Sequence, residues 1–382
     1  MGEINHAQQG FASAYSGKVT ISDLAESLEL PKGTVSKALN GYGDISELTK
    51  ARVTEAADKL GYRPLGHAQA IRTGRIKSVG LVLQTDEHDG YGIFLRDFLA
   101  GISQHSSAEG WTLTVASAGS QEEFEEVASR LVEQRKVDGF ILPRPRVNDP
   151  RYVFLKTMGI PSVLFGRIDP DAKSDDPMAA WYDIDGESLF ASAVRRMWDF
   201  GHRRVGFVGA PDCYTFAHFR KAGYLQGLAE VGLPFDDDLV VADARTREDG
   251  AQAARRLLSL SEPPTAIIYS TDEAALGVYQ VATDFGLRLG QDLSLSAYDG
   301  TILGQHMHPA LTSFRVDMCE AGAQLSSILV GLTEGEPPDN LRKIAAAELV
   351  EGRTDGPPSL TSQDLAAHIS LHTDQLNIIS HQ

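Results

Sequence analysis

The sequence predicts a small all-α domain with a helix-turn-helix, followed by a larger α/β domain with two lobes and doubly wound parallel sheets. Residues 19–64 hold three short apolar patterns at helical spacing. Between residues 77 and 358, continuous apolar strands alternate with helical patterns in two successive runs, which is typical of parallel sheets covered on both faces. The 382 residues suffice for two to three domains of about 100–200 residues.

Three helices are expected in the first domain. Thr20 can cap the first helix with its hydroxyl. Pro31, which is tolerated in a first helical turn, begins the second helix. The third helix begins after the cap Ser46 and ends at Gly61. The tight turn between the first two helices indicates a helix-turn-helix, although the spacing alone leaves a generic small helical bundle as the alternative.

The larger domain is predicted to contain two similar lobes with a cleft between them. Ligands of such folds bind at the carboxyl ends of the parallel strands. The expected strands are 79–83, 111–116, 139–142, 162–165, 205–208, 239–242, 266–269 and 294–298. The expected helices are 124–134, 186–200, 219–231, 250–260 and 273–285.

Charge and composition exclude several classes of protein. The net charge is −17, but residues 1–75 carry nine basic and eight acidic side chains, so the acidity lies in the larger domain. Two cysteines exclude a disulfide scaffold. We find no apolar run of about 18 residues and no secretory signal pattern, so the expected compartment is the cytoplasm, with no membrane contact. No catalytic motif occurs, and we expect no enzyme activity, cofactor or metal.

Motifs in both domains resemble the LacI/GalR family of bacterial transcription regulators. The resemblance covers about residues 18–358 and implies a DNA-binding headpiece, a hinge and a two-lobed sensor like a periplasmic binding protein. The motifs are VTISDLA at 19–25, TVSKALNG at 34–41, LGYRP at 60–64, SVGLV at 78–82, DGFI at 138–141, GHRRVGFVG at 201–209, RKAG at 220–223, DEAALG at 272–277, YD at 298–299 and PALT at 309–312.

Composition and resemblance together divide the chain into five segments. They are a disordered N-terminal tail at 1–18, a helix-turn-helix DNA-binding domain at 19–64, a hinge helix or linker at 65–76, an effector-binding and dimerisation domain at 77–358, and a C-terminal tail at 359–382. Within the sensor, the N-lobe is expected at 77–181 and 316–345, and the C-lobe at 182–315 and 346–358.

The second helix is expected to enter the major groove with its first turns at the bases. Lys32, Gly33 and Lys37 occupy the family's base-contacting positions, and a lysine ammonium can donate to guanine O6 and N7. The short polar side chains suited to phosphate contacts are Ser22, Thr34, Ser36, Asn40, Ser46 and Thr49. A helix cap is the alternative role for such a hydroxyl, and it is favoured at Ser46.

Residues 65–72 resemble the family's hinge helix, from which an apolar side chain enters the minor groove. Ile71 occupies the wedge position, and Ala68 lies one turn earlier on the same side. Such a wedge unstacks and kinks the duplex, and the bend permits more contacts. A plain flexible linker is the alternative.

Arg220 and Asp299 match the family's effector-binding arginine and acid. A guanidinium is a planar fork that can hold two adjacent hydroxyls, and a carboxylate accepts hydroxyl hydrogens from a polyol. The pair is typical of a sugar site, with an internal salt bridge as the alternative. Further expected contacts are Thr271, Arg167, Arg144, Phe94, Phe216 and Trp181; for each of the aromatic residues a packed core ring is the alternative.

Some positions depart from the family pattern. Glu29 stands in the turn where Gly is usual, and Lys37 stands where Arg is usual. In the cleft, Gly166 replaces a common Asp and Thr271 a common Asn. Because these losses reduce polar contacts, Arg167 is expected to compensate, and the effector's hydroxyl pattern is expected to differ from that of common hexoses.

The resemblance implies a sequence-specific DNA-binding repressor that acts as a homodimer on a pseudo-palindromic operator. A small carbohydrate bound between the lobes is expected to control operator affinity, and to release the DNA. A purine or another non-sugar corepressor remains the alternative within this class. A sugar-binding protein without a DNA role is a more distant alternative.

Overall fold

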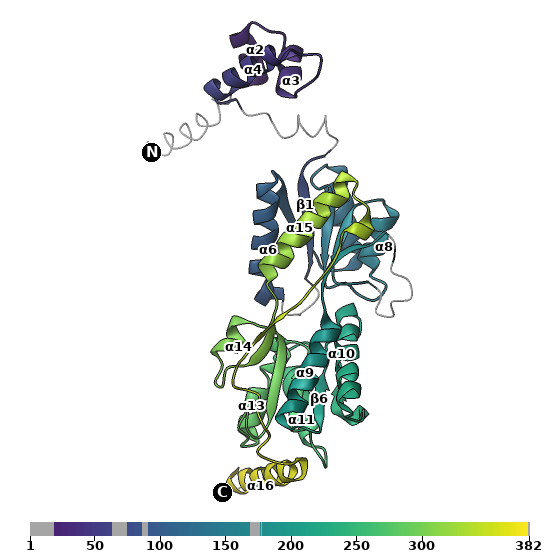
Figure 1. Ribbon diagram of the computed structural model, residues 1–382, viewed down its shortest axis with the longest axis vertical. Coiled ribbons are helices and arrows are strands. Elements are labelled where there is room, and N and C mark those ends of the chain that lie inside the picture. The colour runs from purple at the N-terminus through teal and green to yellow at the C-terminus, as the bar shows by residue number, and fades with distance from the viewer. Residues whose placement is uncertain (1–18, 63–74, 86–90, 169–175, 177, 381–382) are drawn as a thin grey trace, which may run out of the picture. The chain divides into compact units, whose positions relative to one another are not determined.

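The computed structural model describes residues 19–62, 75–85, 91–168, 176 and 178–380 (Figure 1). The chain divides into two compact units, with the boundary between Ile76 and Lys77. The predicted hinge contacts Ala68 and Ile71 lie outside the described residues. None of the helices in the described ranges is long and apolar enough to cross a membrane.

The first unit is the predicted helix-turn-helix. Leu24, Val35 and Val53, one from each helix, have no exposed surface and form the centre of its core. The hydroxyls of Thr20 and Ser46 accept backbone N–H groups and cap two of the helices, as predicted. Within residues 19–62 the helices are α2 (Ile21–Leu28), α3 (Lys32–Leu39) and α4 (Glu47–Leu60).

The turn between α2 and α3 contains Glu29 in a left-handed conformation, with φ 53°. Its N–H donates to the carbonyl of Glu26 at 3.1 Å, which ends α2. A Cβ makes this conformation unfavourable by about 1–2 kcal/mol. The glutamate therefore keeps the geometry of the usual glycine turn at a cost in folding free energy.

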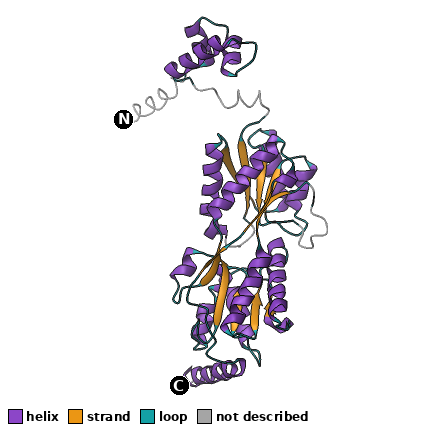
Figure 2. Ribbon diagram, viewed as in Figure 1, coloured by secondary structure: helices purple, strands orange, loops and turns teal. Residues whose placement is uncertain are grey.

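The N-lobe of the second unit contains a parallel sheet with strand order β11-β5-β4-β3-β1-β2. Helices cover both faces of this sheet (Figure 2). Its strands are β1 (Ser78–Gln84), β2 (Thr112–Ala118), β3 (Gly139–Pro143), β4 (Ser162–Phe165), β5 (Ala180–Ile184) and β11 (Arg342–Ala345). Helices α6 (Tyr91–Ala108) and α15 (Met318–Glu334) share one hydrophobic core with the sheet, and α7 (Gln121–Glu133) and α8 (Pro150–Thr157) share the other.

The C-lobe repeats this plan, with strand order β12-β10-β9-β8-β6-β7. Among its described strands, β12 runs antiparallel to β10 and the others pair in parallel. The strands are β6 (Val205–Val208), β7 (Val240–Val241), β8 (Ala266–Tyr269), β9 (Ser294–Asp299), β10 (Thr312–Arg315) and β12 (Glu348–Val350). The helices are α9 (Gly186–Phe200), α10 (Thr215–Val231), α11 (Arg247–Leu258), α12 (Asp272–Ala275), α13 (Val278–Asp284) and α14 (Ile302–His306), with a short 3-10 helix, η1 (Asp237–Leu239). A second 3-10 helix, η2 (Pro338–Asn340), precedes β11 in the N-lobe.

Within the described residues the chain crosses between the lobes after Ile184, Arg315 and Ala345. The first segment of the N-lobe was expected to end at about residue 181, and no strand was expected there, but the structure has β5 at this position. Strand β5 stays in the N-lobe sheet to Ile184, because it pairs with β4 on one side and β11 on the other.

The segment 359–382, predicted as a tail, contains a helix, α16 (Ser362–Ser380). Leu365 is fully buried and Ile369 nearly so, and both pack into the C-lobe core. Residues four apart lie on one face of a helix. The helix is therefore part of the C-lobe, although most of its residues are polar and indicate a tail in the sequence.

Candidate functional site

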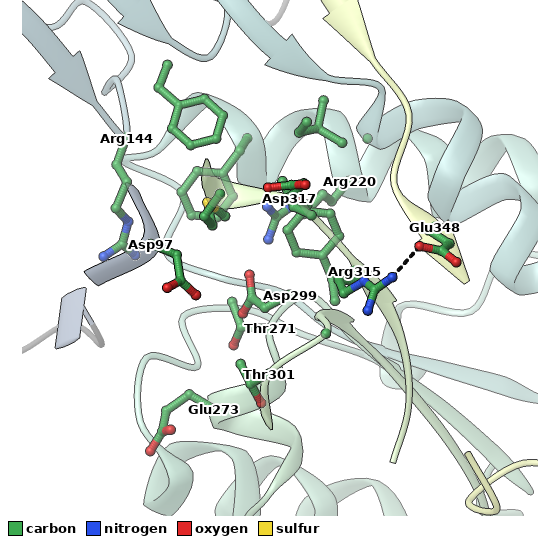
Figure 3. Close-up of a pocket in the computed structure, with 18 of the residues that line it drawn as sticks. Asp97, Arg144, Arg220, Thr271, Glu273, Asp299, Thr301, Arg315, Asp317 and Glu348 are labelled. Carbon is green, nitrogen blue, oxygen red and sulfur yellow. Dashed lines mark hydrogen bonds and ion pairs between the residues drawn. The ribbon is translucent and has the colours of Figure 1, made fainter. Parts of the chain in front are cut away.

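A cavity of about 1100 Å³ lies between the two lobes of the second unit (Figure 3). Phe165 and Ile184 line it at the ends of β4 and β5, and Tyr298 and Asp299 line it at the end of β9. The cavity thus lies at the carboxyl ends of parallel strands, where such folds bind ligands. Its volume slightly exceeds the roughly 300–1,000 Å³ that is usual for ligand pockets.

Arg220 reaches the cavity from the start of α10 and is 9% exposed. Its Nη1 donates to the carbonyl of Ser270 at 2.5 Å. Its guanidinium carbon lies 3.8 Å from the ring centre of Tyr298 and 4.4 Å from that of Phe216. These contacts fix the plane of the guanidinium, so its other donors are oriented before a ligand binds.

Asp299 ends β9 with a φ of 130°, which is rare for a residue with a Cβ. Its Oδ2 accepts the N–H of Asp272 at 3.3 Å. Asp272 is buried and accepts the Ser313 hydroxyl at 2.5 Å and the Thr301 N–H at 2.7 Å. Strained backbone persists where surrounding structure enforces it, and it clusters at binding sites. We infer that Asp272 and its partners hold Asp299 at the cavity.

The two carboxyl groups have raised pKa values. Burial and, second, the neighbouring Asp272 carboxylate raise the pKa of Asp299 to about 7, although Arg220 opposes them. Burial also raises the pKa of Asp272, to about 6, against its hydrogen bonds from Ser313 and Thr301. Two buried carboxylates this close do not both ionise readily. The ligand-free pair therefore retains a proton below neutral pH.

The pair is expected to make the sensor less stable as the pH rises from about 4 to 7. In this window the folded protein binds more protons than the unfolded chain, because the pKa of Asp299 lies above its ordinary value of 3.8. Each extra proton contributes a slope of about −1.4 kcal/mol per pH unit to the free energy of unfolding. Urea unfolding of wild type and Asp299→Asn across this range should show a smaller loss in the variant; parallel curves would refute the assignment.

Three further predicted contacts also line the cavity: Thr271, Phe216 and Arg144. The hydroxyl of Thr271 accepts the Ala274 N–H at 3.4 Å and caps α12. The guanidinium carbon of Arg144 lies 4.7 Å from the ring centre of Tyr214. The structure therefore brings predicted residues from both lobes to one cavity.

Two predicted contacts are placed elsewhere. Among the described residues that line the cavity, neither Arg167 nor Trp181 is present. Arg167 donates to Asp183 at 2.7 Å and to both carboxylate oxygens of Glu187, at 3.0 and 2.5 Å. Trp181 is a packed ring in the N-lobe core. The side chain of Phe94 lies outside the described part of the structure.

Gly166, where the family often has Asp, has no room for a side chain. Its φ is 126°, and a Cβ would lie 2.8 Å from a ring carbon of Pro145. Arg167 does not compensate for the missing acid, because its donors are directed to Asp183 and Glu187. The polar contacts of this site therefore come mainly from other positions.

Asp272 and Tyr298 were not among the residues predicted to contact the effector. Asp272 supports Asp299, and Tyr298 lies under the guanidinium of Arg220. Each residue is next to a predicted contact in the sequence, and this adjacency was the one feature of the sequence that could have indicated its role. A family motif identifies the residues that contact a ligand more easily than the residues that position those contacts.

Helix α3 presents the predicted base-contacting residues on its outer surface. Lys32, Gly33 and Lys37 are exposed, whereas Val35 and Ala38 pack into the headpiece core. The Nζ of Lys37 lies 2.5 Å from Oδ2 of Asp44. An exposed ion pair of this kind is weak, so nucleic-acid acceptors can compete for the lysine.

Four of the predicted phosphate contacts form two hydrogen-bonded pairs. The hydroxyls of Ser46 and Thr49 are 2.8 Å apart, and Ser46 caps α4. Asn40 donates to the carbonyl of Ser36 at 2.6 Å and to its hydroxyl at 3.4 Å. Ser22 and Thr34, in the first turns of α2 and α3, are partly exposed.

Comparison with known proteins places both units in one family. Residues 20–64 match the family described as bacterial regulatory proteins, lacI family, and residues 194–354 match a periplasmic binding protein-like domain. The HTH-type transcriptional regulator AglR of Rhizobium meliloti is 34% identical over 344 residues, covering 89% of this chain and 95% of AglR. Catabolite control protein A of Priestia megaterium is 30% identical, covering 84% and 95%.

A solved structure of a transcriptional regulator CelR–cellobiose complex has the same architecture. It matches with a TM-score of 0.67 and 25% identity, covering 88% of this chain and all of that one. Family members are regulators and not enzymes. The chain therefore belongs to the LacI family of bacterial DNA-binding transcriptional regulators.

Proposed function

We propose that this regulator is a repressor whose operator affinity is lowered by a small carbohydrate bound between the lobes of its sensor. The observation that carries the proposal is the convergence of Arg220 and Asp299 on one cavity that also contains aromatic rings. The guanidinium can hold two adjacent hydroxyls, and the carboxyl group accepts another. Such a set of groups suits a polyol.

The rest of the cavity also suits a saccharide. Phe165, Phe216 and Phe219 line it and offer apolar faces on which the C–H face of a sugar ring can pack. Thr271 and Arg144 supply further polar groups. A volume of about 1100 Å³ has room for a disaccharide. The relative solved with cellobiose supports this class of ligand.

The headpiece would bind the operator as one of two copies in a homodimer on a pseudo-palindromic site. Lys32, Gly33 and Lys37 would face the bases from the major groove. Hydroxyl and amide side chains would contact phosphates, and apolar hinge residues would enter the minor groove. The phosphate contacts would come from Ser22, Thr34, Ser36, Asn40, Ser46 and Thr49, and the minor-groove contacts from Ala68 and Ile71.

A thermal-shift screen of the full chain against saccharides, sugar phosphates and purines tests the ligand class. A ligand at 100 times its dissociation constant stabilises the folded state by about 2.7 kcal/mol, so we expect a clear upward shift with a mono- or disaccharide. Replacement of Asp299 by Asn should remove most of that shift. A shift with a purine alone would contradict the carbohydrate proposal and favour the corepressor alternative.

A further inference from the structure

The loop after β3 pairs with the opposite lobe. The N–H of Thr215 donates to the carbonyl of Pro145 at 3.1 Å, and the N–H of Val147 donates to the carbonyl of Cys213 at 2.9 Å. Between these bonds, Arg146 and Tyr214 form an antiparallel bridge. We call this pairing of residues 145–147 with 213–215 the latch. It joins the lobes through hydrogen bonds, in addition to the covalent crossings.

The latch lies at the edge of the cavity, away from two of the points where the chain crosses between the lobes. Arg144, next to the latch, and Phe216, just after it, line the cavity. Arg315 and Glu348 line it beside the crossings after Arg315 and Ala345. Figure 3 shows Arg144 and the Arg315–Glu348 ion pair on opposite sides of the cavity, with Asp299 between them. A rotation that opens the cavity about those crossings must therefore part the latch.

A buried ion pair supports the loop that carries the latch. Asp149 and Arg151 are 0% and 1% exposed. Two guanidinium nitrogens of Arg151 donate to Asp149, at 2.6 and 3.0 Å. Its Nη2 also donates to the carbonyls of Pro143 and Arg144, at 3.1 and 3.2 Å, and Asp149 accepts the N–H of Arg146 at 3.0 Å. The pair therefore holds the loop backbone at three points.

The loop needs such support. Arg144 and Asn148, at its two ends, have φ values of 51° and 54°, which residues with a Cβ rarely adopt.

A buried ion pair does not usually make a protein more stable than apolar residues of similar size would, because the cost of desolvating the charges offsets their attraction. Burial raises the pKa of Asp149, but Arg151 and the backbone N–H groups outweigh it and leave that pKa lowered. Asp149 is thus held as a carboxylate.

We propose that Asp149 and Arg151 are positioning residues that hold residues 144–148 in the latch, and that the latch opens as a unit when the lobes separate. The inference deepens the proposed function, because the latch borders the proposed effector cavity. It predicts that weakening the ion pair loosens the latch locally and leaves the two lobe cores intact.

The test is amide hydrogen exchange on the ligand-free full chain. Arg151→Lys keeps the positive charge, but the lysine ammonium lacks the planar guanidinium that makes all of these hydrogen bonds at once. We expect exchange at Val147 and Thr215 to accelerate at least tenfold, while strands β4 and β9 stay as protected as in wild type. Arg196→Lys is the matched control, because Arg196 also pairs with a buried acid, Asp355, but in the C-lobe. If Arg151→Lys does not fold, Asp149→Asn replaces it.

A cross-link gives a second readout. Val147 and Cys213 are opposite one another and exposed, so Val147→Cys with Cys319→Ser should form a 147–213 disulfide with oxidised glutathione. Adding Arg151→Lys should slow its formation at least tenfold. Unchanged exchange and cross-linking, or equal acceleration across both lobes, would overturn the proposal. Because no saccharide is used, a negative ligand screen and a failure of the latch are distinguishable.

Discussion

Replacement of Arg220 by alanine is expected to remove most of the response to a saccharide concentration that just saturates the wild type, and to leave operator binding unchanged. The guanidinium is oriented by Ser270, Phe216 and Tyr298 before a ligand binds. Hydrogen bonds to a charged group contribute about 1.5–3 kcal/mol, so the loss should weaken saccharide binding by roughly 10- to 100-fold. Calorimetric titration measures the binding, and an operator titration measures the response.

Arg245→Ala is the matched control for this variant. Arg245 lines the same cavity, but its side chain is 43% exposed and donates to Asp243 on its own loop. We expect this control to bind the saccharide within a few-fold of wild type. A normal response in Arg220→Ala would show that Arg220 does not bind the effector.

Leu24→Ala is expected to unfold the headpiece and to eliminate operator binding. Leu24 is fully buried in a core shared by three short helices. Leucine-to-alanine changes at such sites cost about 3–5 kcal/mol, while domains of this size rarely hold more than about 3–5 kcal/mol of stability. The second unit is a separate compact unit, so it should keep its own melting transition in calorimetry.

Leu48→Ala tests whether that loss comes from the core. Leu48 lies in the same headpiece, in the first turn of α4, but it is 83% exposed. The same change of side chain should alter stability by less than about 0.5 kcal/mol there. Full operator binding by Leu24→Ala would contradict the structure of the headpiece core.

The elements that could be predicted well are those with one clear signal. Strands 162–165, 205–208 and 266–269 match β4, β6 and β8, because continuous apolar runs mark strands buried on both faces. Helix 273–285 was predicted as one element but forms α12 and α13. Gly277 lies at the break, where a Cβ would come within 2.0 Å of the carbonyl of Arg247. That close approach comes from tertiary packing and has no local pattern.

The site could be predicted in part. The resemblance identified Arg220 and Asp299, which come from α10 and β9 and line the same cavity. Arg167 was wrongly expected in the cavity. Sequence spacing does not reveal which carboxylate pairs with a guanidinium, and in the structure Arg167 pairs with Asp183 and Glu187. The apolar pattern also missed strand β5, since Asp183 interrupts the apolar run; the structure buries Asp183 and pairs it with Arg167. Such residues are specified by contacts between distant segments.

We propose that a carbohydrate in the interlobe cavity controls binding to the operator. The most direct test is an operator titration of the full chain with and without the saccharide from the screen, in wild type and in Arg220→Ala. Allosteric coupling is typically about 1–3 kcal/mol, so we predict a 5- to 150-fold loss of operator affinity in wild type at a saccharide concentration that just saturates it, and little loss in the variant at the same concentration. Saccharide binding at the cavity without any change in operator affinity would show that the saccharide is not the effector.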